Sequence, residues 1–415
     1  MYRILWVSAY ALHDSSSGAA IQCRTMLEYL KRIYGQQVDI KALCSLFFDD
    51  PHGSGYFPQL SELNAKPQVP HQFRENGIEY IYAKCHTTVL REFTDAEMRA
   101  AFGVYNNVLR QFRPDLIIGY GGDMFTTVVR YDAAARGIPV VYCVCNGNHK
   151  YYSFSSCAAV ITDSQATAEY YRTNFGVNVL PVGTFIDPEQ VVSAPETRTR
   201  EFVTMVNPAP YKGLGIFARL ALMAQKQLPE VKFLVVETRG TFAQHIEQLH
   251  EPGPGGEKRH ILKPQMFPNV EIQAHTRTIS TVYAETRLLL APSLWFECWG
   301  RAASEAVLNG IPVLASKSGG LPEAAGERCG AAVCLDTPQE CQRDHQLLPS
   351  EAQVQPWLDQ LKVMLEGDYA NQCAEAARQF DPQRSASRVW EVLEPLLMRA
   401  AGSDSQLLRS GWSTR

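Results

Sequence analysis

Two glutamates with seven residues between them, Glu297 and Glu305, are well suited to binding a ligand rich in hydroxyl groups. A carboxylate accepts two hydroxyl hydrogen bonds at once, which is what the neighbouring hydroxyls of a ribose or another sugar offer. The backbone N–H groups of Cys298, Trp299 and Gly300 lie just before a short expected helix, and a helix N-terminus is suited to a phosphate. These residue types therefore suit a ligand that carries both neighbouring hydroxyl groups and a phosphate.

The elements around these glutamates are expected to be a strand, a loop, a helix and a second strand. Residues 288–291 form a short apolar run closed by proline and serine, and residues 311–315 form a second buried run. Between them, residues 301–308 are helix formers, and an Asn-Gly pair follows. Glu297 lies in the loop after the first strand, where open α/β sheets bind ligands. This alternation predicts an α/β fold with doubly wound parallel sheets.

The ordered motifs of this segment resemble the donor site of family-4 glycosyltransferases. The E-x7-E spacing is followed by Asn-Gly-Ile-Pro-Val at 309–313 and by Gly-Gly-Leu-Pro-Glu at 319–323. The resemblance implies a GT-B fold, in which two Rossmann-like domains face a central cleft. It also implies transfer of a sugar from a UDP- or GDP-linked donor to an acceptor hydroxyl with retention of configuration. By the same resemblance, Glu297 holds the transferred sugar and Glu305 the ribose; the alternative is two ordinary glutamates, one in a surface loop and one paired with a lysine.

A second candidate phosphate site follows the strand expected over residues 201–206. The loop after it contains prolines and ends in Lys212 and Gly213, before a helix expected over 214–226. Lys212 supplies positive charge, and Gly213 allows the backbone to approach a phosphate. A positive charge at a helix start opposes the helix dipole, which favours an anionic partner. We therefore predict a catalytic role for Lys212 beside Glu297; an ordinary surface lysine is the alternative.

Three further donor-side positions depend on the resemblance. Family-4 members usually carry an arginine that clamps the diphosphate where this chain has Asn207. Asparagine still donates hydrogen bonds but brings no charge. Thr276 and Arg277 follow the strand expected over residues 269–273, at a position that borders the nucleotide base in the family.

Loops after the strands of the N-terminal half are expected on the acceptor side of the cleft. Gly18 precedes the first helix, Gly121 follows a strand, and Asn146 and His149 follow the next one. Many family members carry a histidine at the end of that last strand, where this chain has Cys145. The departure puts histidine-assisted chemistry in doubt, although His149 lies only four residues further on.

Cys143, Cys145 and His149 could also be read as metal ligands. Three ligands on one strand and loop, without a second pair, make a poor zinc site. We therefore predict no metal, and no cofactor apart from the nucleotide sugar as co-substrate.

Length and composition limit the class of protein. A chain of 415 residues is long enough for two domains with full cores. A net charge of −4 creates no global field that favours nucleic acid. The first eleven residues lack a basic start and a cleavage site, and no apolar run approaches the roughly 20 residues that span a bilayer. Eleven scattered cysteines favour free thiols, so we expect a cytoplasmic protein with at most peripheral contact at the inner membrane face.

A polar, proline-containing stretch at residues 192–200 is the expected linker. We predict an acceptor-side Rossmann-like domain, a nucleotide-sugar-binding Rossmann-like domain, a helix that crosses back to the first domain, and a flexible tail, at residues 1–192, 193–380, 381–399 and 400–415. The acceptor class stays open between a glycan, a lipid and a small molecule. Two alternatives to transfer also stay open: a GT-B epimerase or hydrolase that releases the sugar to water, and a non-catalytic nucleotide-sugar-binding partner subunit.

Overall fold

The computed structural model describes residues 1–57, 70–147 and 154–402, which divide into two compact units. Unit 1 contains the chain up to Phe185 and from Pro382 onward, and unit 2 contains residues 186–381. The division falls before the predicted boundary at residue 192, because residues 186–192 belong with unit 2. Within them, the Val191 carbonyl accepts a hydrogen bond of 3.0 Å from the Asn309 side chain of unit 2.

Among the described residues, the main sheet of unit 1 has eight strands in the order β3-β4-β2-β1-β5-β6-β7-β8. All neighbours run parallel except β3 and β4. The strands are β1 Tyr2–Val7, β2 Val38–Ser45, β3 His71–Glu75, β4 Ile78–Ala83, β5 Leu116–Gly119, β6 Val140–Val144, β7 Ala159–Thr162 and β8 Leu180–Pro181. The helices are α1 Gly18–Tyr34, α3 Asp95–Phe112, α4 Met124–Ala135, α5 Gln165–Phe175 and α15 Pro382–Gly402.

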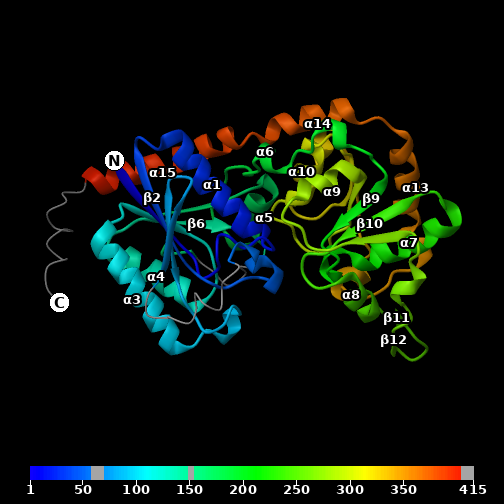
Figure 1. The fold of residues 1–415 in the computed structure, drawn as a ribbon, viewed down its shortest axis with the longest axis horizontal. Helices are drawn as coiled ribbons and strands as arrows, with labels where there is room; N and C mark the ends of the chain where they lie inside the picture. Colours follow the sequence, from blue (N-terminus) through cyan, green and yellow to red (C-terminus); the bar gives the residue numbers. More distant parts are fainter. Residues whose placement is uncertain (58–69, 148–153, 403–415) are drawn as a thin grey trace. The chain divides into compact units, whose positions relative to one another are not determined.

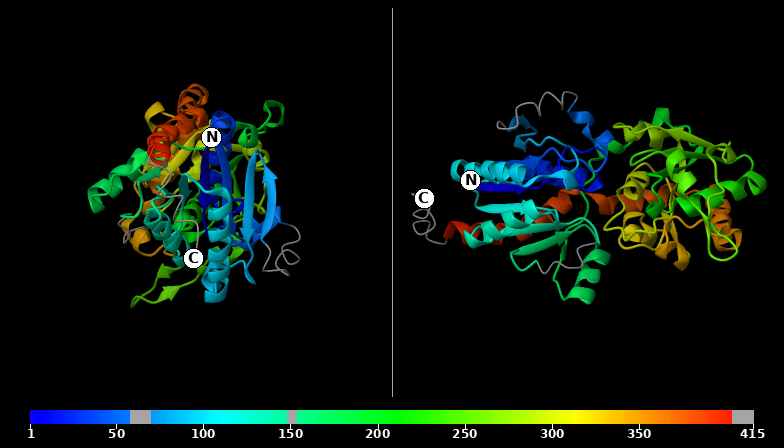
Figure 2. Two further views of the ribbon diagram at one scale, coloured as in Figure 1. Left: turned by 90° about the vertical axis from the view of Figure 1, so that its left-hand side faces the viewer. Right: turned by 90° about the horizontal axis from the view of Figure 1, so that it is seen from below.

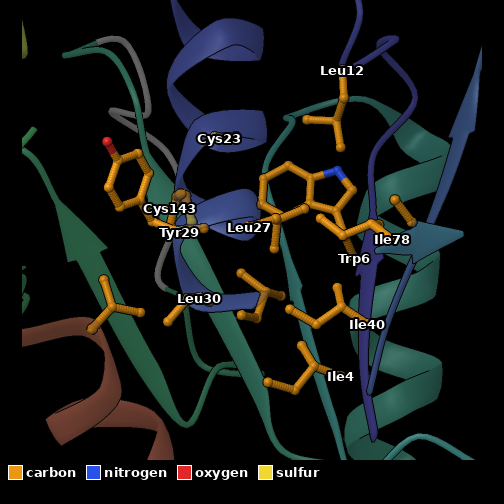
Figure 3. Close-up of a cluster of buried hydrophobic side chains, with 14 of the residues drawn as sticks. Ile4, Trp6, Leu12, Cys23, Leu27, Tyr29, Leu30, Ile40, Ile78 and Cys143 are labelled. Atoms are coloured by element: carbon orange, nitrogen blue, oxygen red, sulfur yellow. The ribbon is translucent and has the colours of Figure 1, made fainter. Parts of the chain in front are cut away.

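Strand β1 is apolar throughout because both of its faces are covered. Ile4 and Trp6 belong to the buried cluster beneath α1 and α15, which Figure 3 shows in part. Leu5 and Val7 belong to the cluster beneath α3 and α4 on the opposite face. Successive side chains of a strand point to opposite faces, so a continuous apolar run is what a doubly covered parallel strand requires.

Strand β3 and its hairpin with β4 were not predicted from the sequence. Asn76 and Gly77 join the two strands with φ values of 48° and 77°. An Asn-Gly pair with two positive φ angles is the preferred two-residue hairpin turn. Figure 2 shows these light-blue strands side by side at one edge of the sheet.

The C-terminal helix α15 belongs to unit 1. Its Trp390 ring stacks on Tyr34 of α1 with centroids 4.4 Å apart. The helix continues to Gly402, so residues 400–402 are helical rather than part of a tail, and residues 403–415 lie outside the described residues. Among the described residues, no helix is both long enough and apolar enough to cross a bilayer.

The sheet of unit 2 is parallel, in the order β13-β10-β9-β14-β15-β16 (Figure 1). Its strands are β9 Phe202–Val206, β10 Lys232–Val236, β13 Val270–Gln273, β14 Thr286–Ala291, β15 Val313–Ser316 and β16 Ala332–Leu335. One face packs on α7 Leu214–Gln227, α8 Phe242–Gln248 and α13 Glu351–Glu366. The other packs on α9 Ile279–Glu285, α10 Arg301–Leu308, α11 Leu321–Ala324 and α14 Ala370–Ala377. The short elements are α6 Pro188–Val191, α12 Gln339–Arg343 and the β11–β12 hairpin of Glu251–Pro252 and Lys258–Arg259. The predicted α/β class with two Rossmann-like units is therefore confirmed.

Candidate functional site

The candidate site lies at the point in unit 2 where the strand order reverses. From β9 the chain proceeds to β10 on one side, and β14 lies on the other side of β9. The loops that follow β9 and β14 therefore leave the sheet next to each other at its carboxyl edge. In open α/β sheets this switch point is where ligands bind. The first loop carries Lys212 and the second carries Glu297.

Lys212 and Glu297 form an ion pair with Nζ and Oε1 2.5 Å apart. The Ser293 hydroxyl donates to the same carboxylate oxygen at 2.8 Å. Only 25% of the Lys212 side chain and 14% of the Glu297 side chain are exposed, so water screens the pair poorly. The two residues were predicted for separate parts of a ligand, and the structure brings them together.

The two loops are also joined through their backbones. The Tyr211 carbonyl accepts hydrogen bonds from the N–H groups of Leu294 and Trp295 at 3.0 and 3.1 Å. Gly213 has a φ of 87°, and a Cβ at this residue would lie 2.0 Å from the Pro292 carbonyl oxygen. Gly213 is therefore required by the close approach of protein backbone, a different reason from the phosphate contact that was predicted.

A glycine turn after β15 fixes the backbone of Glu297. The Gly320 N–H donates to the Glu297 carbonyl at 2.7 Å. Gly319 has a φ of 54°, and a Cβ there would lie 2.2 Å from the same carbonyl oxygen. Ser318 donates its hydroxyl to the Trp295 carbonyl in the same loop. Sequence reasoning noted the Gly-Gly motif but did not assign it, or Ser293, to the site.

Glu305 lies on α10 and has its own partners. Its carboxylate contacts Arg301 Nε at 2.6 Å and accepts a hydrogen bond of 2.8 Å from the Tyr283 hydroxyl. Burial and the nearby Glu305 charge raise the pKa of Tyr283 well above its usual value, so the phenol stays protonated and donates. Glu305 is buried, and a carboxylate with these two partners retains lone pairs for a further hydroxyl.

Residues 298–300, which precede α10, offer backbone N–H groups rather than side chains to the candidate site. Cys298 is buried, and the Trp299 indole donates to the Ser304 hydroxyl at 2.8 Å and packs edge-on against Phe380. Gly300 is the N-cap residue with a φ of 107°, and no side chain caps the helix. The prediction for these residues concerned only their N–H groups. The side chains of Cys298 and Trp299 pack inside unit 2.

Asn207 occupies a left-handed turn with a φ of 69°, a conformation that asparagine tolerates. Its side-chain oxygen accepts the Ala209 N–H at 3.2 Å, which fixes the start of the Lys212 loop. Thr276 and Arg277 follow β13, the edge strand, which lies beyond β10 from β9. There the Thr276 hydroxyl accepts the Thr278 N–H at 3.1 Å, and Arg277 is exposed.

In unit 1 the strand order reverses between β1 and β5. Gly18, in the first turn of α1, is exposed, and nothing lies within 4 Å of a Cβ built there. Gly121, after β5, has a φ of 122°, and its carbonyl accepts from Arg130 at 2.8 Å. The Asn146 carbonyl, after β6, accepts from the Tyr171 hydroxyl at 3.0 Å. The predicted His149 lies outside the described residues.

Cys145 lies in a group of thiols between α1 and β6. Its sulfur is 3.8 Å from that of Cys23, and Cys143 lines the same small pocket, where Figure 3 shows it beside Cys23. All eleven cysteines are free thiols. Among the described residues, no group of three His, Cys, Asp or Glu side chains could hold a metal ion.

Comparison with protein-family models gives a match to part of the chain. Residues 188–340 match the family model described as glycosyl transferases group 1. The segment contains Lys212, Glu297, Glu305 and every other donor-side residue predicted from the sequence.

Solved structures with similar folds cover nearly the whole chain. HepE (Alr3699) of Anabaena, in complex with UDP and glucose, is 16% identical with a TM-score of 0.61, over 95% of this chain and 99% of its own. A glycosyltransferase of Rickettsia africae is 14% identical with a TM-score of 0.63, over 95% of this chain and 98% of its own. This chain has the GT-B fold.

A relative of known function matches over only part of its length. The phosphatidylinositol N-acetylglucosaminyltransferase gpi3 subunit of Schizosaccharomyces pombe is 23% identical over 282 residues, which cover 62% of this chain. The match spans 58% of that relative, less than two thirds of its length.

Within this GT-B chain, the site in unit 2 combines groups suited to a nucleotide sugar. The ammonium of Lys212 can contact a phosphate oxygen, and Glu297 can accept hydroxyl hydrogen bonds from a sugar. The backbone N–H groups before α10 offer a further anion contact. The arrangement places a cation, a carboxylate and backbone donors next to one another at the carboxyl edge of the sheet.

Proposed function

We propose that this protein is a glycosyltransferase that moves a sugar from a nucleoside diphosphate to an acceptor hydroxyl, with retention of configuration. The observation that carries the proposal is the contact of 2.5 Å between Lys212 and Glu297 at the switch point of unit 2. A cation for phosphate and a carboxylate for sugar hydroxyls lie side by side, as the bond between a sugar and a diphosphate requires. The family match of residues 188–340 and the GT-B fold support the proposal.

The donor is assigned to unit 2. Lys212 and the N–H groups of residues 298–300 bind the diphosphate, and Glu297 holds hydroxyls of the transferred sugar. Glu305 holds the ribose through the lone pairs that Arg301 and Tyr283 leave open. UDP is the first nucleotide to test because HepE was solved with UDP and glucose, and GDP is the second.

In the proposed step, the acceptor oxygen forms a bond to the anomeric carbon as the bond from that carbon to the phosphate oxygen breaks. Both bonds lie on the same face of the sugar, which retains its configuration. The acceptor proton passes to the departing phosphate oxygen, so no protein base is required. Lys212 stabilises the charge that grows on the diphosphate, and this lowers the barrier.

The acceptor is assigned to the loops of unit 1 that carry Gly18, Gly121 and Asn146. A lipid hydroxyl is a reasonable first acceptor, because the name of the S. pombe relative contains phosphatidylinositol. A lipid acceptor would require peripheral contact at the cytoplasmic face of a membrane. The nucleotide sugar is the co-substrate, and the proposal includes no other cofactor.

The test is incubation with a panel of UDP- and GDP-linked sugars, followed by measurement of released nucleoside diphosphate and of larger products. Release that requires an acceptor is expected. Release without an acceptor would indicate the hydrolase or epimerase, and binding without release would indicate the partner subunit.

Variants connect activity to the site. Glu297→Ala and Lys212→Ala are each expected to lower kcat/KM by about 100-fold or more. Glu201→Ala and Lys232→Ala provide the matched control, because these residues form an exposed ion pair of 3.5 Å in the same unit. Unchanged turnover in both site variants would show that the assigned site is wrong.

A further inference from the structure

The charges of the candidate donor site do not yet balance a diphosphate. Lys212 is paired with Glu297, and Arg301 is paired with Glu305. Each pair is neutral overall, whereas a nucleoside diphosphate carries more than one negative charge. Catalysis gains from donors and cations that are already placed where charge develops. A further cation near Lys212, at the carboxyl edge of the sheet, would therefore add positive charge where the diphosphate is proposed to bind.

Arg239 is a cation in the right place. It lies in the loop after β10, and β10 neighbours β9, whose loop carries Lys212. One terminal guanidinium nitrogen of Arg239 is 3.4 Å from the Tyr211 hydroxyl. The Tyr211 ring lies 5.8 Å from Lys212 Nζ and 5.6 Å from the Trp295 ring. Tyr211 thus bridges Arg239 to the loops that form the Lys212–Glu297 pair.

The backbone of Arg239 is held in place by α8. Its carbonyl accepts a hydrogen bond of 2.9 Å from His245 Nε2. Gly240 has a φ of 68°, and a Cβ there would lie 2.5 Å from the same nitrogen. The Glu237 carboxylate accepts the Phe242 N–H at 2.7 Å, which fixes the start of the loop. Such bracing means that little order has to be gained when a ligand binds.

We propose that Arg239 binds the diphosphate of the donor and supplies the positive charge that Asn207 lacks. Asn207 is uncharged, and its side-chain oxygen is used in the turn to Ala209. A guanidinium is planar and donates two parallel hydrogen bonds to a phosphate, which suits a diphosphate better than a point charge does. Tyr211 is a positioning residue that orients the guanidinium through its hydroxyl. This inference rests on the proposed function, because it assigns a further residue to the same donor.

The experiment compares ligands that differ only in phosphate. UDP and GDP are titrated by calorimetry into the full-length protein, and the tighter ligand is then compared with its monophosphate and its nucleoside. Arg239→Gln is expected to weaken diphosphate binding by about 10- to 150-fold, the range for a hydrogen bond to a charged group. Nucleoside binding should change by less than about twofold, because a nucleoside has no phosphate for the guanidinium to contact.

Three further variants sharpen the result. Arg239→Lys keeps the positive charge but lacks the two parallel N–H donors of the guanidinium, so its diphosphate affinity should lie between those of Arg239→Gln and the wild type. Tyr211→Phe keeps the ring and removes the hydroxyl. The affinity for the diphosphate is expected to fall by about threefold, because one weak hydrogen bond that orients the guanidinium is lost. Arg259→Gln, on the exposed strand β12 of the same unit, is the matched control and should bind like the wild type.

The outcomes separate the two proposals. If the wild type binds a diphosphate and Arg239→Gln leaves both the diphosphate and the nucleoside affinity unchanged, Arg239 is not a phosphate ligand and the proposed function stands. If Arg239→Gln weakens nucleoside and diphosphate equally, the residue acts on the fold, and the inference is again overturned. If the wild type binds neither UDP nor GDP, the proposed function and this inference fall together.

Discussion

Lys212 Nζ lies 2.5 Å from Glu297 Oε1, although the two residues are 85 positions apart in the sequence. The contact exists because β9 and β14 are neighbours, so the loops that follow them meet at the carboxyl edge of the sheet. In the ligand-free chain each residue compensates the charge of the other. A donor that brings phosphate to Lys212 and hydroxyls to Glu297 can take over both roles, so the pair is poised to exchange partners.

Breaking this pair should destabilise unit 2. Lys212→Met leaves a Glu297 carboxylate that is only 14% exposed without its cation. We expect a loss of about 1–3 kcal/mol in the free energy of unfolding, between the values for exposed and buried pairs. Urea unfolding measures it. Lys232→Met is the control, since Lys232 and Glu201 are 57% and 50% exposed, and its loss should be about 0–1 kcal/mol. Equal losses in the two variants would contradict the expectation that the partly buried Lys212–Glu297 pair stabilises unit 2 more than an exposed pair does.

Gly319→Ala should displace Glu297. A Cβ at residue 319 would lie 2.2 Å from the Glu297 carbonyl, so the loop must move. A shift of this size at Glu297, which is proposed to hold the substrate, is expected to lower kcat/KM by about 100-fold. Gly310→Ala is a matched control, because Gly310 also has a positive φ, 72°, but nothing lies within 4 Å of its Cβ. The control should lose stability, about 1 kcal/mol, and keep its activity. Activity loss in Gly310→Ala of the same size would mean that strain, rather than displacement of Glu297, is responsible.

Much of the fold follows from local patterns in the sequence. Apolar runs bounded by turn residues predicted β14 and β15, and helix formers predicted α10, to within two residues at each end. The hairpin of β3 and β4 was missed although Asn76-Gly77 marks it. The reason is that β3 is mostly polar and only partly buried, so it shows no apolar alternation.

The site was less predictable because it depends on pairing between distant strands. Sequence motifs identified Lys212 and Glu297 one at a time, and only the sheet order places them in contact. Arg239 has no motif around it, and its proximity to Tyr211 depends on β10 lying beside β9. The demand for glycine at position 213 was recognised, but its cause is the Pro292 carbonyl of a loop far along the chain.

The stability of unit 1 should fall as the pH decreases below 7, because of His13. Burial lowers the pKa of His13 from its ordinary 6.5, while its contact of 2.8 Å with Glu75 works in the opposite direction. The unfolded chain therefore binds a proton at His13 at a pH where the folded chain does not. Neutral His13 therefore contributes its full stabilisation above pH 6.5, and this contribution is lost as the pH falls from there towards the pKa of the folded state.

The other titratable groups facing His13 limit where this effect can be seen. Tyr82, at 2.6 Å, and Tyr80 are buried phenols whose pKa values are raised by burial, so neither titrates in this range. The charge of Arg24 acts in the same direction as burial and lowers the pKa of His13. The hydrogen bond from His13 lowers the pKa of Glu75 to about 2, so Glu75 adds a loss of stability only below its ordinary 4.5.

Urea midpoints between pH 5 and pH 8 test this prediction, with His13→Gln as the comparison. The wild type should lose stability on acidification more steeply than the variant. Parallel profiles would show that His13 does not cause the dependence.

Cys145 should be dispensable for the chemistry. The hydrogen bond with Cys23 lowers the pKa of Cys145. Burial and the nearby Asp163 and Cys143 together raise it by more, so the net pKa lies above the usual 9.0. The group is therefore a neutral thiol near pH 7 and a poor proton acceptor. Cys145→Ala is expected to keep kcat/KM within about threefold of the wild type, whereas loss of a general base costs about 100-fold or more. A larger loss, restored by Cys145→His, would return the residue to the mechanism.

Activity should persist when divalent cations are removed. In the proposed site the diphosphate charge is met by Lys212, by Arg239 and by the N–H groups before α10, so no metal ion is needed to offset it. Turnover measured after treatment with EDTA is expected to stay within about twofold of the untreated rate, because side-chain cations supply the stabilisation that a bound metal would otherwise give. Arg239→Gln lacks one of these charges, and added Mg²⁺ should partly restore its turnover while leaving the wild type unchanged. A wild-type enzyme that loses activity in EDTA and regains it with Mg²⁺ or Mn²⁺ would show that a metal ion, rather than Arg239, completes the charge.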